Sequence, residues 1–413
     1  MCRERALVRI AGPWPTGSGL PPDLQNSGNV TIVSLATGTD FRWQYERAPA
    51  MDEIALSSQS MFAELLQRCL DGEFDETFQE QGSFVRRRRD TRYYWYFRWD
   101  AGGAKHERYV GPVTDKSITD RVTRFARIKS DYKQRREMVR ALLATRLPAP
   151  DAMAGSVVEA MWKAGFFRLR GVLVGSLAYP CYAGPLGIRL TAASVRTDDA
   201  DFAQFWGVSE NIGENMEQPL TVLRTVDPSF REVPDLSDPF VTSRYSTKTG
   251  YKVEFLTPNR GSDDHTGKAA KMKALAGAGA QPLRHLESLI HQPERSVMLF
   301  GGGVPVTLPR AERYAVHKII VAVERRDQVK AQKDIVQAGT LITATAKRRP
   351  LELGEAWLEA WNVGPRWREK LDAGRERLSD GERNELKRVV ELAKGAGERR
   401  SARKARRRDR DPS

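Results

Sequence analysis

Hydrophobic and polar positions follow three different patterns along this chain. Aromatic and β-branched runs separated by turn residues occupy 82–112 and predict a small antiparallel sheet. Residues 117–145 have apolar side chains at helical spacing and end before Pro148 and Pro150, so they predict one long helix. Short apolar runs alternate with helical patterns over 151–326, and 327–396 are helical throughout. We therefore predict an α/β (α+β) fold with a small mixed-sheet core, an N-terminal helix and β-hairpin module, and a helical C-terminal region.

The expected domain boundaries follow these changes of pattern. Residues 1–50 are rich in Pro, Gly, Ser and Asn without sustained periodicity, so we expect a poorly structured extension there. Met51 and Met61 are alternative start positions for the folded part. The further segments are an N-terminal module over 51–112, a linking helix over 113–150, the core over 151–326, a helical region over 327–396 and a basic disordered tail over 397–413.

A Gly-Ser pair directly follows an apolar run of the predicted core. Residues 167–174 read as a buried strand, and Gly175 and Ser176 come at its end. Glycine lets the backbone approach a phosphate closely, and the amides of a following helix would point toward that anion. We therefore predict that Gly175 and Ser176 bind the phosphates of a nucleotide.

Three carboxylates follow on two later strands. Asp199 and Asp201 are two residues apart, so strand alternation puts both on one face while Ala200 and Phe202 enter the core. Glu254 lies in a later apolar strand and can join the same cluster. Two Mg²⁺ ions, with Mn²⁺ as an alternative, would neutralise three such acids and support nucleotidyl transfer. The competing interpretation is that these acids lie at strand ends on the surface, as most Asp and Glu do.

Taken together, these motifs resemble the DNA polymerase beta-like nucleotidyltransferase superfamily. Its pattern is an apolar-Gly-Ser element, an Asp-apolar-Asp strand and a third acid on a later strand. The chain is most similar to a group of bacterial, largely uncharacterised nucleotidyltransferase-fold proteins, through elements at 196–201, 250–258 and 309–318. The resemblance covers about residues 55–330. Two departures are that Ser176 lies 23 positions before Asp199 and that the middle residue of the acidic pair, Ala200, is small.

The resemblance implies an enzyme that transfers NMP from an NTP, with ATP the expected nucleotide, to a hydroxyl of an acceptor. Asp199, Asp201 and Glu254 would be the catalytic and metal-binding residues. The helix over 309–326 would lie beside the active site, so Lys318 is a candidate phosphate ligand. The competing interpretation is that Lys318 is an ordinary exposed helix charge.

Four arginines open the predicted N-terminal sheet, and aromatic residues follow them. Arg86, Arg87, Arg88 and Arg89 are candidate nucleic-acid contacts, because arginines can bind phosphates while neighbouring rings stack on bases. The alternative is that the aromatic face packs on a helix and the arginines face water. The acceptor thus stays open between RNA, a protein side chain and a small molecule, with a macromolecule favoured.

Net charge and cysteine content change this picture little. The formal net charge is +14, and residues 398–413 contribute +5 of it from eight basic and three acidic side chains. This tail either binds along the phosphate backbone of a nucleic acid or is a solvated, disordered end that binds nothing specific. The three cysteines form no CxxC pair, and no apolar run approaches the roughly 20 residues of a membrane span. We expect a cytoplasmic protein without membrane contact.

Two other functions are compatible with the same sequence. A nucleotidyltransferase fold that has lost activity would act as a non-catalytic nucleic-acid-binding protein. A toxin controlled by a cognate antitoxin would have the same catalytic residues as an ordinary transferase. The sequence does not separate these alternatives, and it leaves the oligomeric state open.

Overall fold

A computed structural model of the 413-residue chain describes residues 30–37, 40–47, 52–72, 82–89, 91–101, 104–190, 198–211, 214–234, 241–259 and 268–408. Its contacts separate two units, Met1–Asp52 and Glu53–Ser413. In the first unit, β1 (Val30–Thr37) and β2 (Asp40–Arg47) pair antiparallel, with Val30 opposite Arg47. This hairpin lies where the sequence predicts little regular structure.

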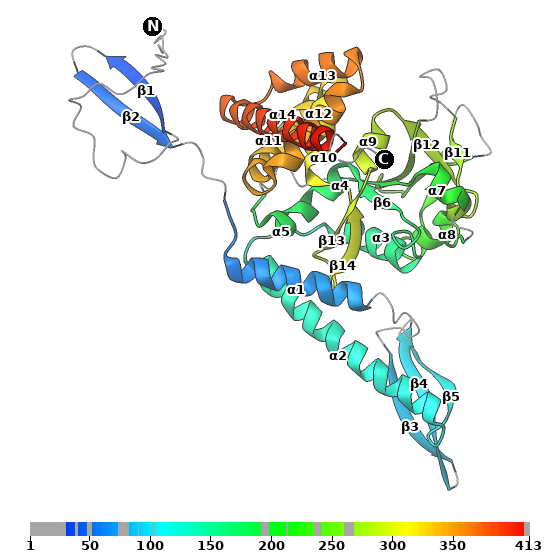
Figure 1. The fold of residues 1–413 in the computed structure, drawn as a ribbon. Helices are drawn as coiled ribbons and strands as arrows, with labels where there is room; N and C mark the ends of the chain where they lie inside the picture. Colours follow the sequence, from blue (N-terminus) through cyan, green and yellow to red (C-terminus); the bar gives the residue numbers. More distant parts are fainter. Residues whose placement is uncertain are drawn as a thin grey trace. The chain divides into compact units, whose positions relative to one another are not determined.

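The centre of the second unit is a mixed seven-stranded sheet (Figure 1). Its main path runs in the order β11-β12-β10-β7-β6; outside this path, β9 pairs with the first residues of β10, and β8 pairs with β9. β10 is parallel to β7 and β12, whereas β6 is antiparallel to β7. The predicted mixed sheet is confirmed. The strands are β6 (Val172–Val174), β7 (Asp199–Ala203), β8 (Arg231–Glu232), β9 (Arg244–Ser246), β10 (Lys252–Pro258), β11 (Ala270–Lys271) and β12 (Gly279–Leu283).

Aromatic side chains fill the core behind β7 and β10. Phe202 and Phe255 lie on these neighbouring strands with ring centroids 5.7 Å apart, and Phe166 meets Phe202 edge-on at 5.2 Å. The strand predicted over 167–174 is wrong in its extent, because β6 covers only its last three residues. Residues 164–170 form turns that insert Phe166 and Phe167 into the core, and a short apolar run cannot distinguish a strand from a buried turn.

Short helices connect the strands of this sheet. Directly after β6, α4 (Gly175–Ala178) runs into the 3₁₀ helix η2 (Tyr179–Tyr182) and then α5 (Ala183–Leu186). The hairpin β13 (Glu294–Met298) and β14 (Val304–Leu308) follows further along the chain. Further short helices described in this region are α7 (Trp206–Asn211), α8 (Pro219–Arg224), η4 (Lys273–Leu275) and α9 (Leu286–Ile290). The longer α3 (Ala152–Lys163) precedes β6.

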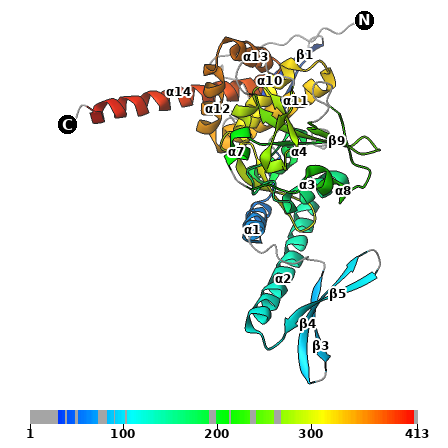
Figure 2. The same cartoon turned by 90° about the vertical axis from the view of Figure 1, so that its right-hand side faces the viewer.

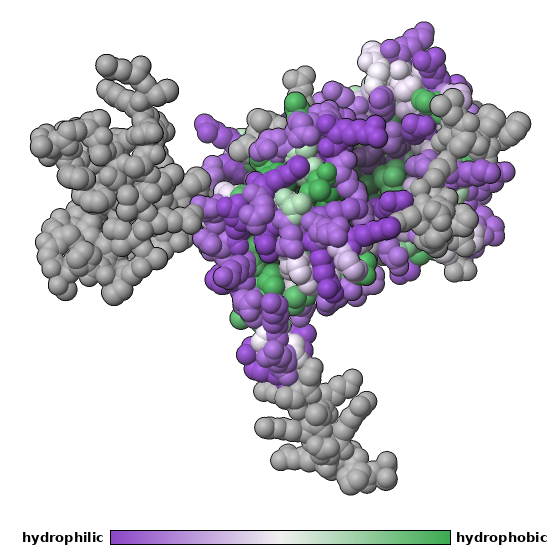
Figure 3. Space-filling model, turned by 90° about the horizontal axis from the view of Figure 1, so that it is seen from above, coloured by the Kyte–Doolittle hydropathy of each residue, from purple (hydrophilic) through white to green (hydrophobic). Residues whose placement is uncertain are grey.

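The C-terminal region is helical, as predicted. It consists of α10 (Ala311–Glu324), α11 (Gln328–Arg348), α12 (Pro350–Asn362), α13 (Pro365–Arg375) and α14 (Asp380–Arg408). The sequence predicts disorder from 397, whereas the helical backbone of α14 continues to Arg408, because Glu, Arg, Lys and Ala favour helix. Arg400 reaches α12 through an ion pair of 3.0 Å with Glu355. The face in Figure 3 is mostly hydrophilic, with small hydrophobic areas near its centre.

The N-terminal module consists of two helices and a three-stranded sheet. α1 (Leu56–Gly72) packs on α2 (Lys116–Ala144), which occupies the range of the predicted linking helix. The sheet of β3 (Ser83–Arg89), β4 (Arg92–Ala101) and β5 (Ala104–Pro112) lies at the end of α2 remote from the core (Figures 1 and 2). At the other end of α2, the buried Arg135 guanidinium donates to the carbonyl oxygen of Gly302 at 3.1 Å. Among the described residues, no helix combines the length and the apolar character that crossing a membrane requires.

Candidate active site

Strand pairing brings the three predicted carboxylates onto one face of the sheet. In the register of β7 with β10, Asp201 lies opposite Glu254 and Asp199 opposite Lys252. Since cross-strand partners point to the same side, Asp199, Asp201 and Glu254 share a face. Each of the three side chains is half-buried, whereas the intervening Ala200 is completely buried on the other face.

Gly175 makes direct contact with this acidic face. β6 pairs with β7 so that Val174 lies opposite Asp201, and Gly175 follows with a φ of +66°. A Cβ atom on Gly175 would lie 2.0 Å from Oδ2 of Asp201. Only glycine fits there, both because of its left-handed backbone and because of the carboxylate. The predicted Gly-Ser element and the acids therefore adjoin.

The helix predicted after this glycine is short. α4 has only four residues before the chain continues as the 3₁₀ helix η2, in which Pro180 lies at one of the first positions. Such a short helix has little macrodipole, so its N-terminus contributes less to anion binding than the sequence prediction assumed. Ser176 is half-buried at the start of α4.

The carboxylates strongly affect one another. Burial and the nearby charges of Asp199 and Glu254 raise the pKa of Asp201 to about 7. Burial also raises the pKa of Glu254, and Asp199 adds to this effect, whereas Arg244, Lys252 and Lys330 oppose it. Both shifts mean that negative charge on this face is unfavourable without a counter-charge.

The acidic face suits a divalent cation chemically, but its side chains alone do not form a complete metal site. Carboxylate oxygens are the ligands that Mg²⁺ prefers, and the crowding of negative charge at Asp201 favours a cation. Nevertheless, no group of three or more His, Cys, Asp or Glu side chains among the described residues is arranged to hold a metal ion. A bound metal would therefore need further oxygen ligands, such as those of a phosphate substrate.

Cations from α10 and its C-terminal cap lie close to the acidic face. Lys318 is 4% exposed, and its Nζ lies 2.6 Å from Oδ1 of Asp334. Arg325 pairs with Oδ2 of the same carboxylate, and we call these three residues the core charge cluster. Burial lowers the pKa of Lys318 although Asp334 counteracts it. The interpretation of Lys318 as an exposed helix charge is therefore wrong, whereas Arg313 turns toward α12 and pairs with Glu359 at 2.5 Å.

Tyr314 connects these helices to the glycine. Its hydroxyl donates to the carbonyl oxygen of Gly175 at 2.9 Å and lies 3.1 Å from the amide oxygen of Gln337. The Nζ of Lys318 lies 5.3 Å from the centroid of the Tyr314 ring, a distance suited to a cation–π contact. Tyr314, Gln337, Arg325 and Asp334 were not identified from the sequence as site residues, because no motif joins them to the acids.

Acidic and basic groups line one pocket of about 580 Å³, a size typical of small-molecule sites. Asp201, Gly175, Lys318 and Arg325 belong to its wall. Apolar side chains supply much of the rest, namely Val174, Leu256, Leu283, Leu286, Leu289 and Val321. The pocket can therefore hold a ligand that combines an anionic group with an apolar or planar one.

The pocket wall also includes two histidines. His285 has a left-handed backbone (φ 64°), its Nε2 lies 3.2 Å from Oε1 of Glu324, and its ring meets Trp367 of α13 edge-on. Hydrogen bonding to His285, together with Lys370, lowers the pKa of Glu324 to about 2. Burial lowers the pKa of His317 to about 3, with Lys318 and His285 adding to the effect, so this imidazole is neutral near pH 7.

Two other basic groups act on the acidic face from the start of α11. Lys330 lowers the pKa of Glu254, and Asp199 favours the charged form of Lys333, whose pKa burial lowers. The four predicted arginines of β3 are elsewhere, in the N-terminal sheet, and do not line this pocket. The side chain of Arg89 lies outside the described residues.

The comparisons with known proteins identify the segment that contains this site. A family model described as Nucleotidyltransferase matches residues 152–362, which is about half of the chain. The matched segment contains the acidic face, Gly175 and the core charge cluster. No curated protein and no solved structure is significantly similar to the chain.

Proposed function

The chain belongs to this nucleotidyltransferase family, and from that premise we propose that it transfers NMP from an NTP to a hydroxyl group of an acceptor. In this reaction the acceptor oxygen bonds to the α-phosphorus, and the bond from that phosphorus to the bridging oxygen breaks. Pyrophosphate leaves with the electron pair of the broken bond, and the hydroxyl proton passes to a base or to solvent.

One observation carries the proposal: Asp201 of the acidic face and the two cations of the core charge cluster line the same pocket. Asp201 approaches Gly175 from the sheet, while Lys318 and Arg325 reach the pocket from α10 and its C-terminal cap. A nucleoside triphosphate bound with a divalent cation has both kinds of charge. The apolar part of the wall suits a nucleobase.

Each of the site residues would have its own role in this reaction. Asp199, Asp201 and Glu254 would hold Mg²⁺, which when bound supplies charge neutralisation for the phosphates and activation of the hydroxyl. Glu254 would also align the acceptor hydroxyl. Gly175, Ser176 and Lys318 would bind the triphosphate, where preformed positive charge stabilises the leaving pyrophosphate.

Asp334 would act as a positioning residue rather than as a ligand. It holds Lys318 and Arg325 through two different oxygens and is itself 2% exposed in its side chain. A buried carboxylate that fixes two cations keeps them oriented before the substrate arrives, which reduces the cost of ordering them on binding.

The proposal can be tested with labelled nucleotides. Purified protein is incubated with Mg²⁺, each α-³²P-labelled NTP in turn, total RNA and lysate, beside an Asp199→Ala/Asp201→Ala variant. The exposed neighbour Asp198 provides the matched control as Asp198→Ala. We expect label transfer by wild type and Asp198→Ala, and a loss of roughly a thousandfold or more in the double variant, in line with removal of key electrostatic groups.

Two results would contradict the proposal. Transfer that survives in the double variant would mean that these acids are not catalytic. No transfer by wild type, together with no Mg²⁺-dependent NTP binding, would favour the non-catalytic binding protein.

A further inference from the structure

The β3-β4-β5 sheet has two faces of different composition, and α2 covers one of them. Phe84 lies 5.1 Å from Phe97 and 5.0 Å from Phe125 of α2, measured between ring centroids. Trp95 Nε1 donates to the Thr119 hydroxyl at 3.2 Å, also on α2. We call this side, which contains Phe84, Trp95 and Phe97, the inner face.

Strand alternation divides the arginine run of β3 between the two faces. Arg86 is on the inner side, where its guanidinium carbon lies 5.0 Å from the centroid of the Trp95 ring. Arg87 points to the other side and pairs with Glu107 of β5 at 2.7 Å. The described side chains of the arginine run, predicted as one set of nucleic-acid contacts, thus do not form one surface, because neighbouring residues of a strand point in opposite directions.

The outer face combines arginines with tyrosines. Arg98 of β4 also pairs with Glu107 at 2.7 Å, so one carboxylate lies between two guanidinium groups, and we call these three residues the arm charge cluster. Tyr94 and Tyr96 alternate with Arg98 on the same side of β4 and are half-buried. Tyr94 lies opposite Arg87, and Tyr96 lies between Tyr94 and Arg98 along β4, so the outer face has planar rings beside positive charge.

We propose that this outer face binds a single-stranded polynucleotide, which is the acceptor of the nucleotidyl transfer; the acceptor role rests on the proposed function. Guanidinium groups bind phosphodiesters, and aromatic rings exposed on a sheet stack on unpaired bases. The charge of the sheet segment itself supports an anionic partner. Residues 82–112 contain eight Lys and Arg against three Asp and Glu, a net charge of +5.

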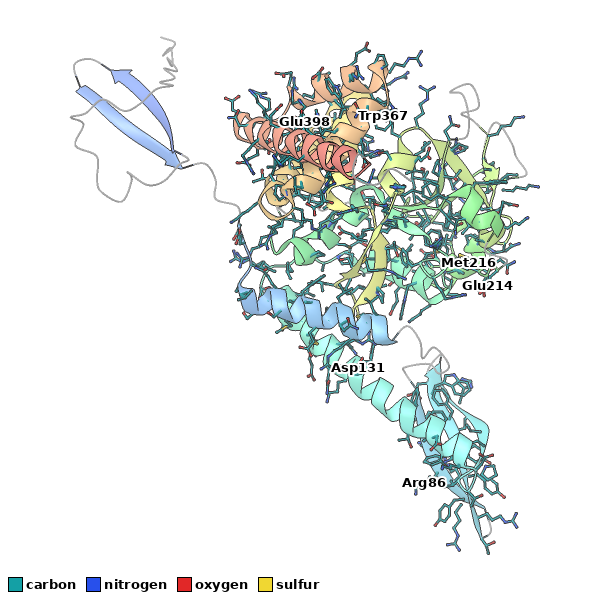
Figure 4. The ribbon with its side chains drawn as sticks, in the orientation of Figure 1. Arg86, Asp131, Glu214, Met216, Trp367 and Glu398 are labelled. Carbon is teal, nitrogen blue, oxygen red and sulfur yellow. The ribbon has the colours of Figure 1, made fainter. Side chains whose placement is uncertain are left out.

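The place of the sheet in the fold favours a long acceptor. α2 has 29 residues and therefore spans about 43 Å at 1.5 Å per residue. The sheet lies at its far end, and Arg86 is remote from Trp367 beside the pocket (Figure 4). A small acceptor cannot reach both places, whereas a long polynucleotide can.

The proposal is tested by binding without NTP or Mg²⁺. Fluorescence anisotropy is measured with a labelled 20-nucleotide oligoribonucleotide, the oligodeoxyribonucleotide of the same sequence and the corresponding duplex. The outer-face variant is Arg87→Ala/Arg98→Ala, and the matched control is Arg86→Ala on the inner face. Arg87→Lys/Arg98→Lys retains the charge and tests whether any loss comes from charge or from folding.

We expect the outer-face alanine variant to bind single strands at least five-fold more weakly than wild type. The slope of log affinity against log salt should become shallower by about two, one for each lost phosphate contact. Arg86→Ala should stay within two-fold of wild type, and the lysine variant should recover most of the affinity. The two single-stranded probes identify which sugar is preferred, and the duplex should bind more weakly than either.

Equal losses in Arg86→Ala and in the outer-face variant would overturn the proposal, as would unchanged binding in the outer-face variant. Binding of no polynucleotide by wild type would also overturn it and would leave a protein partner as the occupant of this face. The Asp199→Ala/Asp201→Ala variant should bind single strands like wild type. A failure of transfer with intact binding therefore rejects the proposed reaction and not the binding face.

Discussion

The core charge cluster and the arm charge cluster have the same composition, one carboxylate between two cations, but their carboxylates have different surroundings. In the core, the side chains of Asp334 and Lys318 are 2% and 5% exposed, and only that of Arg325 reaches 34%. In the arm, the side chain of Glu107 is 30% exposed and the arginines are at least as exposed. Coulomb attraction is several times stronger where water is excluded, so the same three charges have different consequences.

Because of this difference in exposure, the core cluster keeps a fixed geometry, whereas the ion pairs of the arm cluster can exchange partners. Buried charges must stay paired, because an unpaired buried charge is costly, so the core cluster holds its cations at defined positions beside the pocket. Exposed ion pairs contribute little and are screened by salt. The arm cluster can therefore release Glu107 and give its arginines to phosphates, which suits a surface that binds a variable polyanion.

The largest expected effect is the difference in stability between two variants, each of which lacks the carboxylate of one cluster. Asp334→Ala leaves Lys318 buried without its partner and should lower the free energy of unfolding by about 3–5 kcal/mol. Glu107→Ala should leave the unfolding midpoint nearly unchanged, because its pairs are solvated. Urea denaturation of both variants measures the contrast. Equal effects would mean that burial does not distinguish the two clusters.

An intermediate effect is expected for the pH dependence of stability, which the acidic face beside the core cluster should cause. The pKa of Asp201 is about 7 in the folded chain, against 3.8 as its ordinary value. Between these values the folded state binds more protons than the unfolded state, so the free energy of unfolding should fall as pH rises from about 4 to about 7.

Urea denaturation at several pH values in EDTA measures this dependence. Asp201→Asn should flatten it over that interval, whereas Asp198→Asn, at an exposed neighbouring position, should leave it as in wild type. Millimolar Mg²⁺ should stabilise wild type more at pH 8 than at pH 5, since the carboxylate is ionised only at the higher pH. A profile that is the same in wild type and Asp201→Asn would refute the assignment.

The smallest expected effect is a gain in the affinity of the arm for single strands. Glu107→Gln removes the acid that Arg87 and Arg98 share and leaves both guanidinium groups available to phosphates. Affinity for the single-stranded probe should rise a few-fold, and the salt dependence should become steeper. Anisotropy titrations at 50 and 200 mM salt measure both quantities. Weaker binding would show that Glu107 orients the arginines instead of competing for them.

Local patterns in the sequence were sufficient for part of the site. The i, i+2 spacing of Asp199 and Asp201 places both on one strand face, and β7 has them there. The apolar residues around Glu254 predict its strand, and β10 includes it. The long helix, the mixed sheet and the helical C-terminal region were predicted in the same way. Periodicity is a property of neighbouring residues, so it can be read without knowing the fold.

Other parts could not be predicted because they depend on residues distant in the chain. The apolar run over 167–174 has the composition of a strand, but its first half forms a turn, and the Phe167 ring packs 6.4 Å from that of Phe202. Asp334 has no signal of its own, since it lies on the helix after Lys318 and only the packing of α10 on α11 brings the two together.

By itself, then, the sequence determined that two aspartates share one strand face and that a glutamate lies in another strand. Only the tertiary structure decided what those faces meet. Pairing of β6 and β10 with β7 puts Gly175 and Glu254 beside Asp201, and packing of α2 on the N-terminal sheet assigns Arg86 inward and Arg87 outward. The physical reason is that the orientation of a side chain follows from local backbone geometry, whereas its partner and its burial follow from packing between elements far apart in sequence.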